Sequence, residues 1–347
     1  MRTYDLCVIG SGPGGSKAAI AAAKLGKSVV VIEKMDVVGG AAINTGTIPS
    51  KALREAVLAV TVARQVLTAT CSSSSGATLT VNAEAELQQL MGQCHRVIGA
   101  EVSILRSQLL SNGVEIMTGT ASFVDAKTVR VEGRAGTETV QAEYFVIGVG
   151  TVPSRPPNVA FDNATLLTSD EVLKLPTLPR SMIVVGGGVI GTEYASMLAM
   201  LGVRVTLVEG RPRLLEFIDT EISEALQYHM RQMGITLRMA EKVVSMKAIE
   251  APKGARSTDG KMAEATLESG KTIVADTLLY CVGRQGSTAG LNLEAAGLSA
   301  DNRGRIAVDA CYKTKRDHIY AVGDVIGFPA LASTSMEQGR LAAMHMF

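Results

Sequence analysis

The first residues in this chain that could do chemistry are a glycine-rich turn and an acid. In the run Gly10-Ser11-Gly12-Pro13-Gly14-Gly15, the first glycine permits a tight turn, Gly12 lets backbone approach a pyrophosphate, and Gly15 lets a helix pack on the preceding strand. Glu33 follows at the distance, about 20 residues, where an acid accepts hydrogen bonds from ribose hydroxyls. The sequence therefore predicts a dinucleotide site. Its predicted residues are Gly10, Gly12, Gly14, Gly15, Glu33 and Lys34.

The flanking sequence predicts the elements that position this turn. Residues 4–10 (YDLCVIG) form an apolar run of strand length, residues 16–26 read as a helix ending at Gly26, and residues 28–32 read as a second strand. The helix N-terminus then faces the phosphates, because its free N–H groups and its dipole favour anions. This context makes the motif far more specific than a lone GxGxxG.

The same arrangement occurs a second time. Residues 181–185 form an apolar strand, residues 186–191 (GGGVIG) repeat the fingerprint, a helix follows, and the strand 203–208 precedes Glu209. Two complete fingerprints predict two bound dinucleotides, which suits FAD plus a nicotinamide coenzyme. The predicted nicotinamide-site residues from this motif are Gly186, Gly188, Gly191, Glu209 and Arg211.

Two opposing charges leave the choice of nicotinamide coenzyme open. Glu209 favours the ribose hydroxyls of NAD, because a 2′-phosphate would repel it by roughly 4 kcal/mol at a separation of about 4 Å. Arg211 and Arg213 could offset that repulsion through charge-assisted bonds to the phosphate. They could equally be solvated loop residues, so the sequence is compatible with NAD and with NADP.

The stretch Gly39 to Leu53 (GGAAINTGTIPSKAL) resembles the active-site helix of the FAD-dependent pyridine nucleotide-disulfide oxidoreductases, such as lipoamide dehydrogenase. In that family a redox disulfide occupies the positions of Ala42 and Thr47, so this chain lacks both sulfurs. Without a thiolate at the flavin, a disulfide or dithiol substrate is nearly excluded. The resemblance implies that Thr47 and Lys51 face the flavin and tune it.

Further segments carry the same resemblance. Residues 145–153 (FVIGVGTVP) are similar to the end of the first flavin section, residues 282–284 (VGR) to the junction that leaves the nicotinamide domain, and residues 318–324 (HIYAVGD) to the second flavin motif. The resemblance implies that Asp324 binds the ribitol chain. It also implies that Glu193 pairs with Lys51 and that the aromatic Tyr194 gates the nicotinamide pocket. Gly40 and Gly150 are assigned to FAD, and Gly283 and Glu193 to the nicotinamide coenzyme.

The implied fold class is α/β, with two Rossmann-like domains and the NAD(P) domain inserted into the FAD domain. We expect the FAD domain over residues 1–152 and 282–347 and the NAD(P) domain over residues 153–281. Outside the fingerprints, the spacing predicts helices over 51–67, 83–110 and 220–234 and from about 331, with strands at 114–117, 121–123, 128–131, 144–150 and 278–281. Residues 68–82 and 251–263 read as loops.

Within the family, three runs narrow the resemblance: residues 46–54 (GTIPSKALR), 213–219 (RLLEFID) and 324–329 (DVIGFP). Together they look most like the soluble, energy-independent pyridine nucleotide transhydrogenases. That resemblance implies FAD-dependent hydride transfer between NADPH and NAD, ping-pong through the flavin and without a redox disulfide. An NAD(P)H:quinone or acceptor reductase (a diaphorase) and a non-catalytic truncated flavoprotein are the alternatives.

Composition limits the remaining classes. The 347 residues include 35 glycines and carry a formal net charge of +1, which gives no case for binding nucleic acid or a membrane surface. The five cysteines form no close pair and the four histidines have no metal-ligand spacing, so we expect reduced thiols in a cytoplasmic protein and no metal. No apolar run approaches the about 18 residues that a membrane span needs. The family normally continues for roughly one further domain of about 100 residues, so we expect the interface domain of its homodimers to be absent.

Overall fold

The structure is a computed structural model that describes residues 2–71, 83–252 and 260–347. The chain divides into two compact units. Unit 1 comprises residues 1–49, 96–152 and 284–347, and unit 2 comprises residues 50–95 and 153–283. Within the described residues, no helix has the length and apolar character to cross a membrane.

Unit 1 is built on a seven-stranded sheet whose main order is β3-β2-β1-β6-β5-β4, with β17 also paired to β6. The strands are β1 (Arg2–Ile9), β2 (Val29–Glu33), β3 (Glu115–Thr118), β4 (Thr120–Asp125), β5 (Thr128–Gly133), β6 (Gly136–Ile147) and β17 (Ile319–Ala321). Strands β3, β2, β1, β6 and β17 run parallel, and β4 and β5 continue the sheet antiparallel. The carboxyl ends of β1, β6 and β17 therefore meet at one edge.

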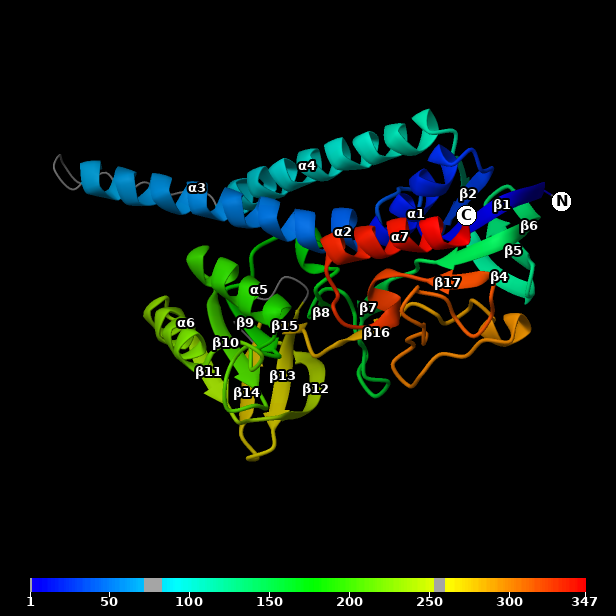
Figure 1. Cartoon of the computed structure of the whole chain (residues 1–347). Helices are drawn as coiled ribbons and strands as arrows, with labels where there is room; N and C mark the ends of the chain where they lie inside the picture. Colours follow the sequence, from blue (N-terminus) through cyan, green and yellow to red (C-terminus); the bar gives the residue numbers. More distant parts are fainter. Residues whose placement is uncertain (1, 72–82, 253–259) are drawn as a thin grey trace. The chain divides into compact units, whose positions relative to one another are not determined.

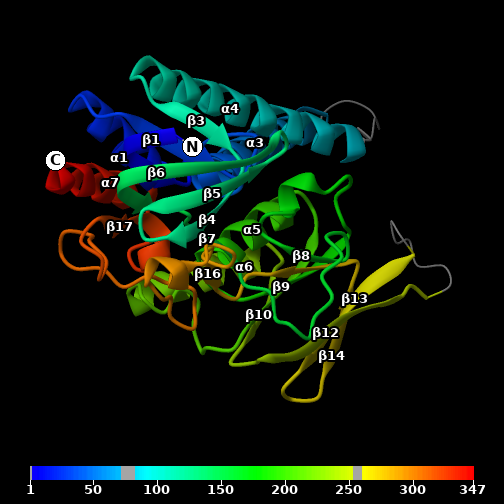
Figure 2. The same cartoon turned by 90° about the vertical axis from the view of Figure 1, so that its right-hand side faces the viewer.

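Two helices of unit 1 pack side by side beside this sheet, as Figures 1 and 2 both show. They are α1 (Pro13–Lys24) and α7 (Ala332–Met346). Small residues permit the close approach: a Cβ added at Gly339 of α7 would collide with the backbone of Gly14. Buried alanines of α1 and Ala342 and Ala343 of α7 belong to one apolar cluster with β1 and β2. The unit also contains α2 (Gly40–Asn44), the later part of α4 (Ala83–Ser111), and the 3-10 turns η2 (Leu293–Ala296) and η3 (Gly323–Ile326). The short strand β16 (Arg284–Gly286) lies in unit 1, and β7 (Thr151–Pro153) begins there.

Unit 2 contains a five-stranded parallel sheet in the order β11-β10-β9-β15-β8 and a three-stranded antiparallel sheet β12-β13-β14. The strands are β8 (Leu166–Thr168), β9 (Ser181–Val185), β10 (Arg204–Glu209), β11 (Thr236–Met239), β12 (Val243–Glu250), β13 (Lys261–Leu267), β14 (Thr272–Ala275) and β15 (Thr277–Tyr280). The helical elements are η1 (Val172–Lys174), α5 (Val189–Met200), α6 (Thr220–Gln232) and the parts of α3 (Thr47–Cys71) and α4 that fall in this unit. Leu53, Val57 and Leu90 of α3 and α4 are buried in one cluster with α5 and β9. The predicted α/β class is confirmed.

Several element boundaries differ from the predicted ones. The helix α1 begins at Pro13 rather than residue 16, because proline is well tolerated in the first turn, where its missing N–H is not needed. For the same reason Pro49 is compatible with the first turn of α3, which begins at Thr47 rather than residue 51. The same helix continues to Cys71, so the predicted loop over 68–71 is wrong. The rest of that loop, 72–82, lies outside the described residues.

The strand β6 starts at Gly136 instead of residue 144, because its first half pairs antiparallel with β5 before its second half joins the parallel strands. The predicted loop over 251–263 is wrong at its end, where β13 begins at Lys261. Residues 253–259 of that loop lie outside the described part of the chain.

Candidate dinucleotide-binding sites

The first fingerprint forms a strand-turn-helix in which Gly10, Gly14 and Gly15 leave no room for a side chain. Gly10 follows β1 with a φ of +100°, and a Cβ there would lie 2.5 Å from the carbonyl oxygen of Gly148 after β6. A Cβ on Gly15 would collide with the carbonyl oxygen of Gly10. A side chain at Gly14 would press on Val322, which precedes η3, at 2.9 Å. These glycines hold the start of α1 against the carboxyl edge of the sheet.

The N-terminus of α1 has no capping side chain among the described residues. Its N-cap is Gly12, which has extended backbone (φ −62°, ψ 179°), no side-chain cap and no acid in the first turn. A Cβ on Gly12 would meet nothing nearer than the Gly148 carbonyl oxygen at 3.9 Å and Gly40 Cα at 4.0 Å. The first N–H groups of a helix have no partner within it, so this cradle fits a pyrophosphate such as that of FAD.

Glu33, at the end of β2, is 6% exposed and is held by three donors. Its Oε2 accepts hydrogen bonds from the Ser11 N–H at 2.9 Å and the Ser11 hydroxyl at 2.6 Å, and its Oε1 accepts one from the Met35 N–H at 3.0 Å. The Ser11 hydroxyl also accepts from the Gly39 N–H at 2.9 Å. A carboxylate has about four acceptor positions, so Oε1 keeps one for a ribose hydroxyl. Lys34 Nζ donates to the Ser287 hydroxyl at 3.2 Å, and its predicted contact with FAD stays a prediction.

Asp324 lies in η3, directly after β17, at the same sheet edge as Gly10. Its Oδ2 accepts a 3.3 Å hydrogen bond from the Thr151 hydroxyl, which in turn accepts from Arg284 Nε at 2.8 Å. Gly40 and Gly150 have φ values of +58° and +63°, which favour glycine. Asp324 is only half-buried, and its other oxygen suits a sugar-alcohol hydroxyl. The donor and acceptor set of unit 1 therefore fits FAD.

The second fingerprint repeats the first in unit 2. Gly186 follows β9 with a φ of +106°, and a Cβ there would lie 3.0 Å from the Cys281 carbonyl oxygen. A Cβ on Gly191 would collide with the carbonyl oxygen of Gly186, whereas one on Gly188 would meet nothing within 4 Å. Gly188 caps α5 without a side-chain hydrogen bond. A second anion cradle results, and Gly283 (φ +81°) follows the neighbouring strand β15.

Glu209 ends β10 and is held by four donors. Its Oε2 accepts from the Gly187 N–H at 2.6 Å and from Arg211 Nη2 at 2.9 Å, and its Oε1 accepts from the Arg211 N–H at 2.9 Å and from Arg211 Nε at 3.0 Å. Burial opposes ionisation of Glu209, but the hydrogen bonds from Arg211 and Gly187 outweigh it and hold the pKa of this carboxyl below its ordinary value. Arg213 is not at this carboxylate; it donates to the Thr220 hydroxyl at the start of α6.

Lys51 and Glu193 form an ion pair within unit 2, between α3 and α5. Their side chains are 53% and 36% exposed, so the pair is solvated and contributes at most about 1 kcal/mol to stability. Thr47 and Ala42 lie at the start of α3 and in α2. The structure thus contains the pair that the resemblance implied, while the roles of Lys51, Glu193 and Thr47 beside a flavin stay predictions.

Tyr194 does not suit the expected role as a gate. Its ring is 3% exposed in the core of unit 2, and among the described residues its hydroxyl has no hydrogen-bond partner. Burial raises the pKa of this phenol. The Tyr194 ring therefore lies in the core of unit 2 and not at its surface.

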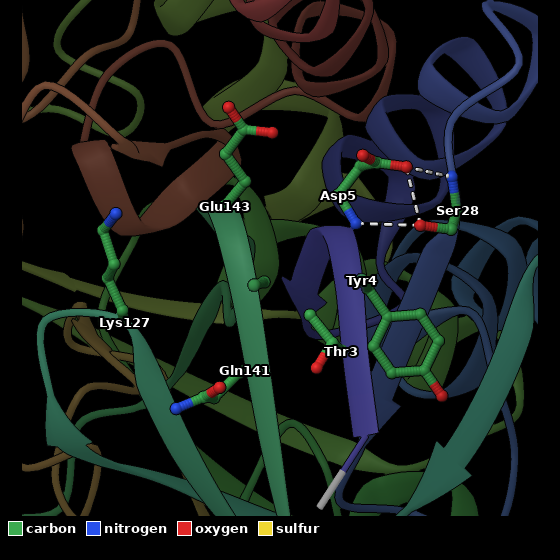
Figure 3. A pocket seen from close by; sticks show the side chains of 8 residues that line it. Thr3, Tyr4, Asp5, Ser28, Lys127, Gln141 and Glu143 are labelled. Atoms are coloured by element: carbon green, nitrogen blue, oxygen red, sulfur yellow. Dashed lines mark hydrogen bonds between the residues drawn. The ribbon is translucent and has the colours of Figure 1, made fainter.

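A surface hollow of about 550 Å³ lies elsewhere in unit 1 (Figure 3). Its lining includes Tyr4, Asp5, Lys127 and Glu143, and Asp5 is already bonded to Ser28. It sits beside the first half of β1, away from the carboxyl edge where α/β sheets bind ligands. We do not assign it to the dinucleotides. The described residues contain no group of three or more His, Cys, Asp or Glu side chains that could hold a metal ion.

The two cradles together define a protein class. The pyridine nucleotide-disulphide oxidoreductase family matches residues 4–339, and the chain belongs to this family of oxidoreductases, which use a flavin and a nicotinamide coenzyme. The predicted family and its cofactors, FAD and NAD(P), are confirmed. The chain is 50% identical over 349 residues to a soluble pyridine nucleotide transhydrogenase of Mycobacterium tuberculosis, covering 100% of this chain and 71% of that protein. It is 42% identical over 344 residues to the soluble pyridine nucleotide transhydrogenase of Yersinia pestis, covering 99% and 70%.

Solved structures agree with this fold. The copper(II) complex of the HOCl-induced flavoprotein disulfide reductase RclA from Escherichia coli has a TM-score of 0.82 at 26% identity, covering 99% of this chain and 70% of that one. LpdA from Mycobacterium tuberculosis has a TM-score of 0.83 at 26% identity, covering 99% and 72%.

Sequence reasoning missed three contacts at these sites: the Ser11 hydroxyl on Glu33, the Arg211 guanidinium on Glu209, and the Thr151 hydroxyl on Asp324. The first had a readable signal, because a serine inside the fingerprint can reach the acid that follows the second strand. The second had one as well, since an arginine two residues after an acid at a strand end can fold back on it.

Proposed function

We propose that this chain transfers hydride between NADPH and NAD with FAD bound in unit 1 and the nicotinamide coenzyme in unit 2. The observation that carries the proposal is the pair of equally built dinucleotide cradles, combined with alanine and threonine at positions 42 and 47. Two dinucleotides and no thiol at these positions favour hydride exchange over disulfide chemistry. The names of the relatives, soluble pyridine nucleotide transhydrogenase, support the same activity.

The residues of unit 1 bind and orient the cofactor in this proposal. The start of α1 at Gly12 holds the pyrophosphate, Glu33 accepts from the adenosine ribose, and Asp324 accepts from the ribitol chain. When bound, FAD supplies the ring that accepts a hydride from one nicotinamide coenzyme and returns it to the next. The protein's own contribution is orientation and electrostatics.

The residues of unit 2 take the coenzymes in turn. The described residues contain one further cradle, at Gly188, so NADPH and NAD use the same site successively, which is ping-pong order. Lys51, held by Glu193, places a positive charge that favours electron uptake by the cofactor. We further propose a cytoplasmic protein, supported by scattered cysteines of which Cys7 and Cys94 are buried and unpaired.

Anaerobic stopped-flow absorbance of the FAD-loaded protein tests the activity. NADPH should bleach the flavin absorbance, and NAD or thio-NAD added next should restore it within the turnover time. Recovery with a quinone or oxygen but not with NAD would make the protein an acceptor reductase instead. A purified protein that neither carries nor takes up FAD would contradict both enzyme functions.

A further inference from the structure

Glu209 has no acceptor position left for a coenzyme. A carboxylate offers about four lone-pair positions, and the four donors from Gly187 and Arg211 use two on each oxygen. Glu33 in the first fingerprint differs, because it has three donors, and none of these three belongs to a lysine or arginine. The ribose hydroxyls of NAD can therefore reach Glu209 only after the Arg211 side chain has moved.

Arg211 is free to make that move. Its side chain is 43% exposed, whereas that of Glu209 is 8% exposed. A second carboxylate lies within reach of Arg211, with Glu216 Oε2 4.0 Å from Arg211 Nη1. The guanidinium can leave Glu209 for Glu216 without losing an ionic partner, while the two backbone N–H donors keep Glu209 in place.

A 2′-phosphate offers Arg211 a third partner. Guanidinium groups bind phosphate oxygens through paired, charge-assisted hydrogen bonds. An uncompensated Glu209 would repel that phosphate, but a guanidinium between the two groups contacts both charges. Arg213 is already engaged with Thr220 at the start of α6, so Arg211 is the cation in position.

We propose that Arg211 is the coenzyme-selecting residue: its guanidinium exchanges between Glu209, Glu216 and the 2′-phosphate of NADP(H), so one site accepts both coenzymes. With NADP(H), Arg211 binds the phosphate and shields it from Glu209. With NAD(H), Arg211 turns to Glu216 and frees Glu209 for the ribose hydroxyls. This inference rests on the proposed function, in which unit 2 receives both coenzymes.

The experiment uses fragments that lack nicotinamide, so binding is measured without any hydride transfer. Isothermal titration of the FAD-loaded protein with 2′,5′-ADP and with ADP reports the phosphate and hydroxyl forms separately. In Arg211→Gln we expect 2′,5′-ADP to bind about tenfold or more weakly, while ADP binds as in wild type or more tightly. The affinity of Arg211→Lys for 2′,5′-ADP should lie between those of wild type and Arg211→Gln, because lysine keeps the positive charge but lacks the paired N–H donors of a guanidinium.

Two further variants complete the test. Glu216→Gln removes the alternative carboxylate partner of Arg211 and should weaken the binding of ADP more than that of 2′,5′-ADP. Arg213→Gln is the matched control and should change neither. Equal weakening of both fragments in Arg211→Gln, or a selective loss of 2′,5′-ADP in Arg213→Gln, would overturn the inference. A wild-type protein that binds ADP but not 2′,5′-ADP would overturn it too. Failure of hydride transfer alone, with these affinities as expected, would contradict only the proposed function.

Discussion

The two fingerprints of this chain start from the same construction and differ in one side chain beside the acid. In both, the acid that ends the second strand accepts one backbone N–H from the glycine turn and one from two residues further along the chain. The side chain that donates differs: Glu33 accepts one hydrogen bond from the neutral hydroxyl of Ser11, and Glu209 accepts two from the guanidinium of Arg211. The backbone scaffold is thus common, and a single side chain sets the local charge.

That difference matches two kinds of occupant. A carboxylate with neutral donors and one open acceptor position suits a ribose with free hydroxyls that stays bound, as in FAD. A carboxylate neutralised by a mobile cation suits coenzymes that come and go and that differ by one phosphate. The residue beside the acid can therefore determine whether the same strand-turn-helix suits a cofactor that stays bound or coenzymes that bind and leave.

Blocking each cradle separately should have the largest effect. Gly12→Asp and Gly188→Asp both fit the extended N-cap backbone, and neither added Cβ meets an atom closer than 3.9 Å. The new carboxylate would cap the helix but repel a pyrophosphate by roughly 4 kcal/mol, about a thousandfold in affinity. We expect Gly12→Asp to lose FAD and Gly188→Asp to keep FAD and lose ADP, by flavin content and titration. The reverse pattern would exchange the assignments of the two units.

Removing the hydroxyl of Ser11 should have the second largest effect, a loss of stability of the folded protein at the first site. Ser11 is fully buried and its hydroxyl serves both Glu33 and the buried N–H of Gly39. Ser11→Ala leaves that N–H unsatisfied, at a cost of about 1–3 kcal/mol in the free energy of unfolding. Denaturant unfolding of the FAD-free protein measures it. Ser16→Ala is the control, because its hydroxyl reaches only the Pro13 carbonyl oxygen at 3.2 Å; an equal loss in both variants would contradict the specific role.

The helices after the two cradles carry opposite charges at one position. Lys17 of α1 and Glu193 of α5 each lie five residues after the capping glycine, and only Glu193 holds Lys51. Lys51→Ala should slow flavin reduction by NADPH about tenfold, or about 1.4 kcal/mol in the barrier, because a positive charge favours electron uptake. FAD content should stay unchanged. Lys17→Ala is the control, and an unchanged rate in Lys51→Ala would remove this role.

The smallest effect concerns acid stability. The folded pKa of Glu209 is lowered, so its contribution to stability is present above its ordinary pKa and is lost as the pH falls through the folded value. Wild type should therefore lose stability between about pH 5 and pH 3 by up to about 1 kcal/mol more than Glu209→Gln does. Thermal melting across that range checks it. Parallel curves for the two proteins would show that the ion pair contributes nothing.

Local geometry explains why so much could be predicted from the sequence. Gly10 and Gly15, like Gly186 and Gly191, are required by contacts within a few residues or with the adjacent strand, so their spacing carries the fold. The first residue of α3 could not be predicted from the sequence, because Pro49 can lie in the first turn of a helix or in the loop that precedes it. The length of β6 depended on its pairing with β5, which no local pattern reveals. The spacing of Arg211 two residues after Glu209 permits their contact, but it equally permits a bond to a ligand phosphate, so the sequence alone does not choose between the two partners.

The close packing of α1 on α7 has a consequence for synthesis of the protein. The first fingerprint precedes unit 2 in the chain, yet Gly14 is covered by Gly339, and Asp324 and β17 also come from the segment that follows unit 2. Unit 2 is complete in sequence at residue 283, whereas unit 1 needs residues 284–347. Because domains fold as units during synthesis, unit 2 can fold while the chain is still attached to the ribosome. The FAD cradle is then completed after unit 2, by the strand β17 and the helix α7, which follow unit 2 in the chain.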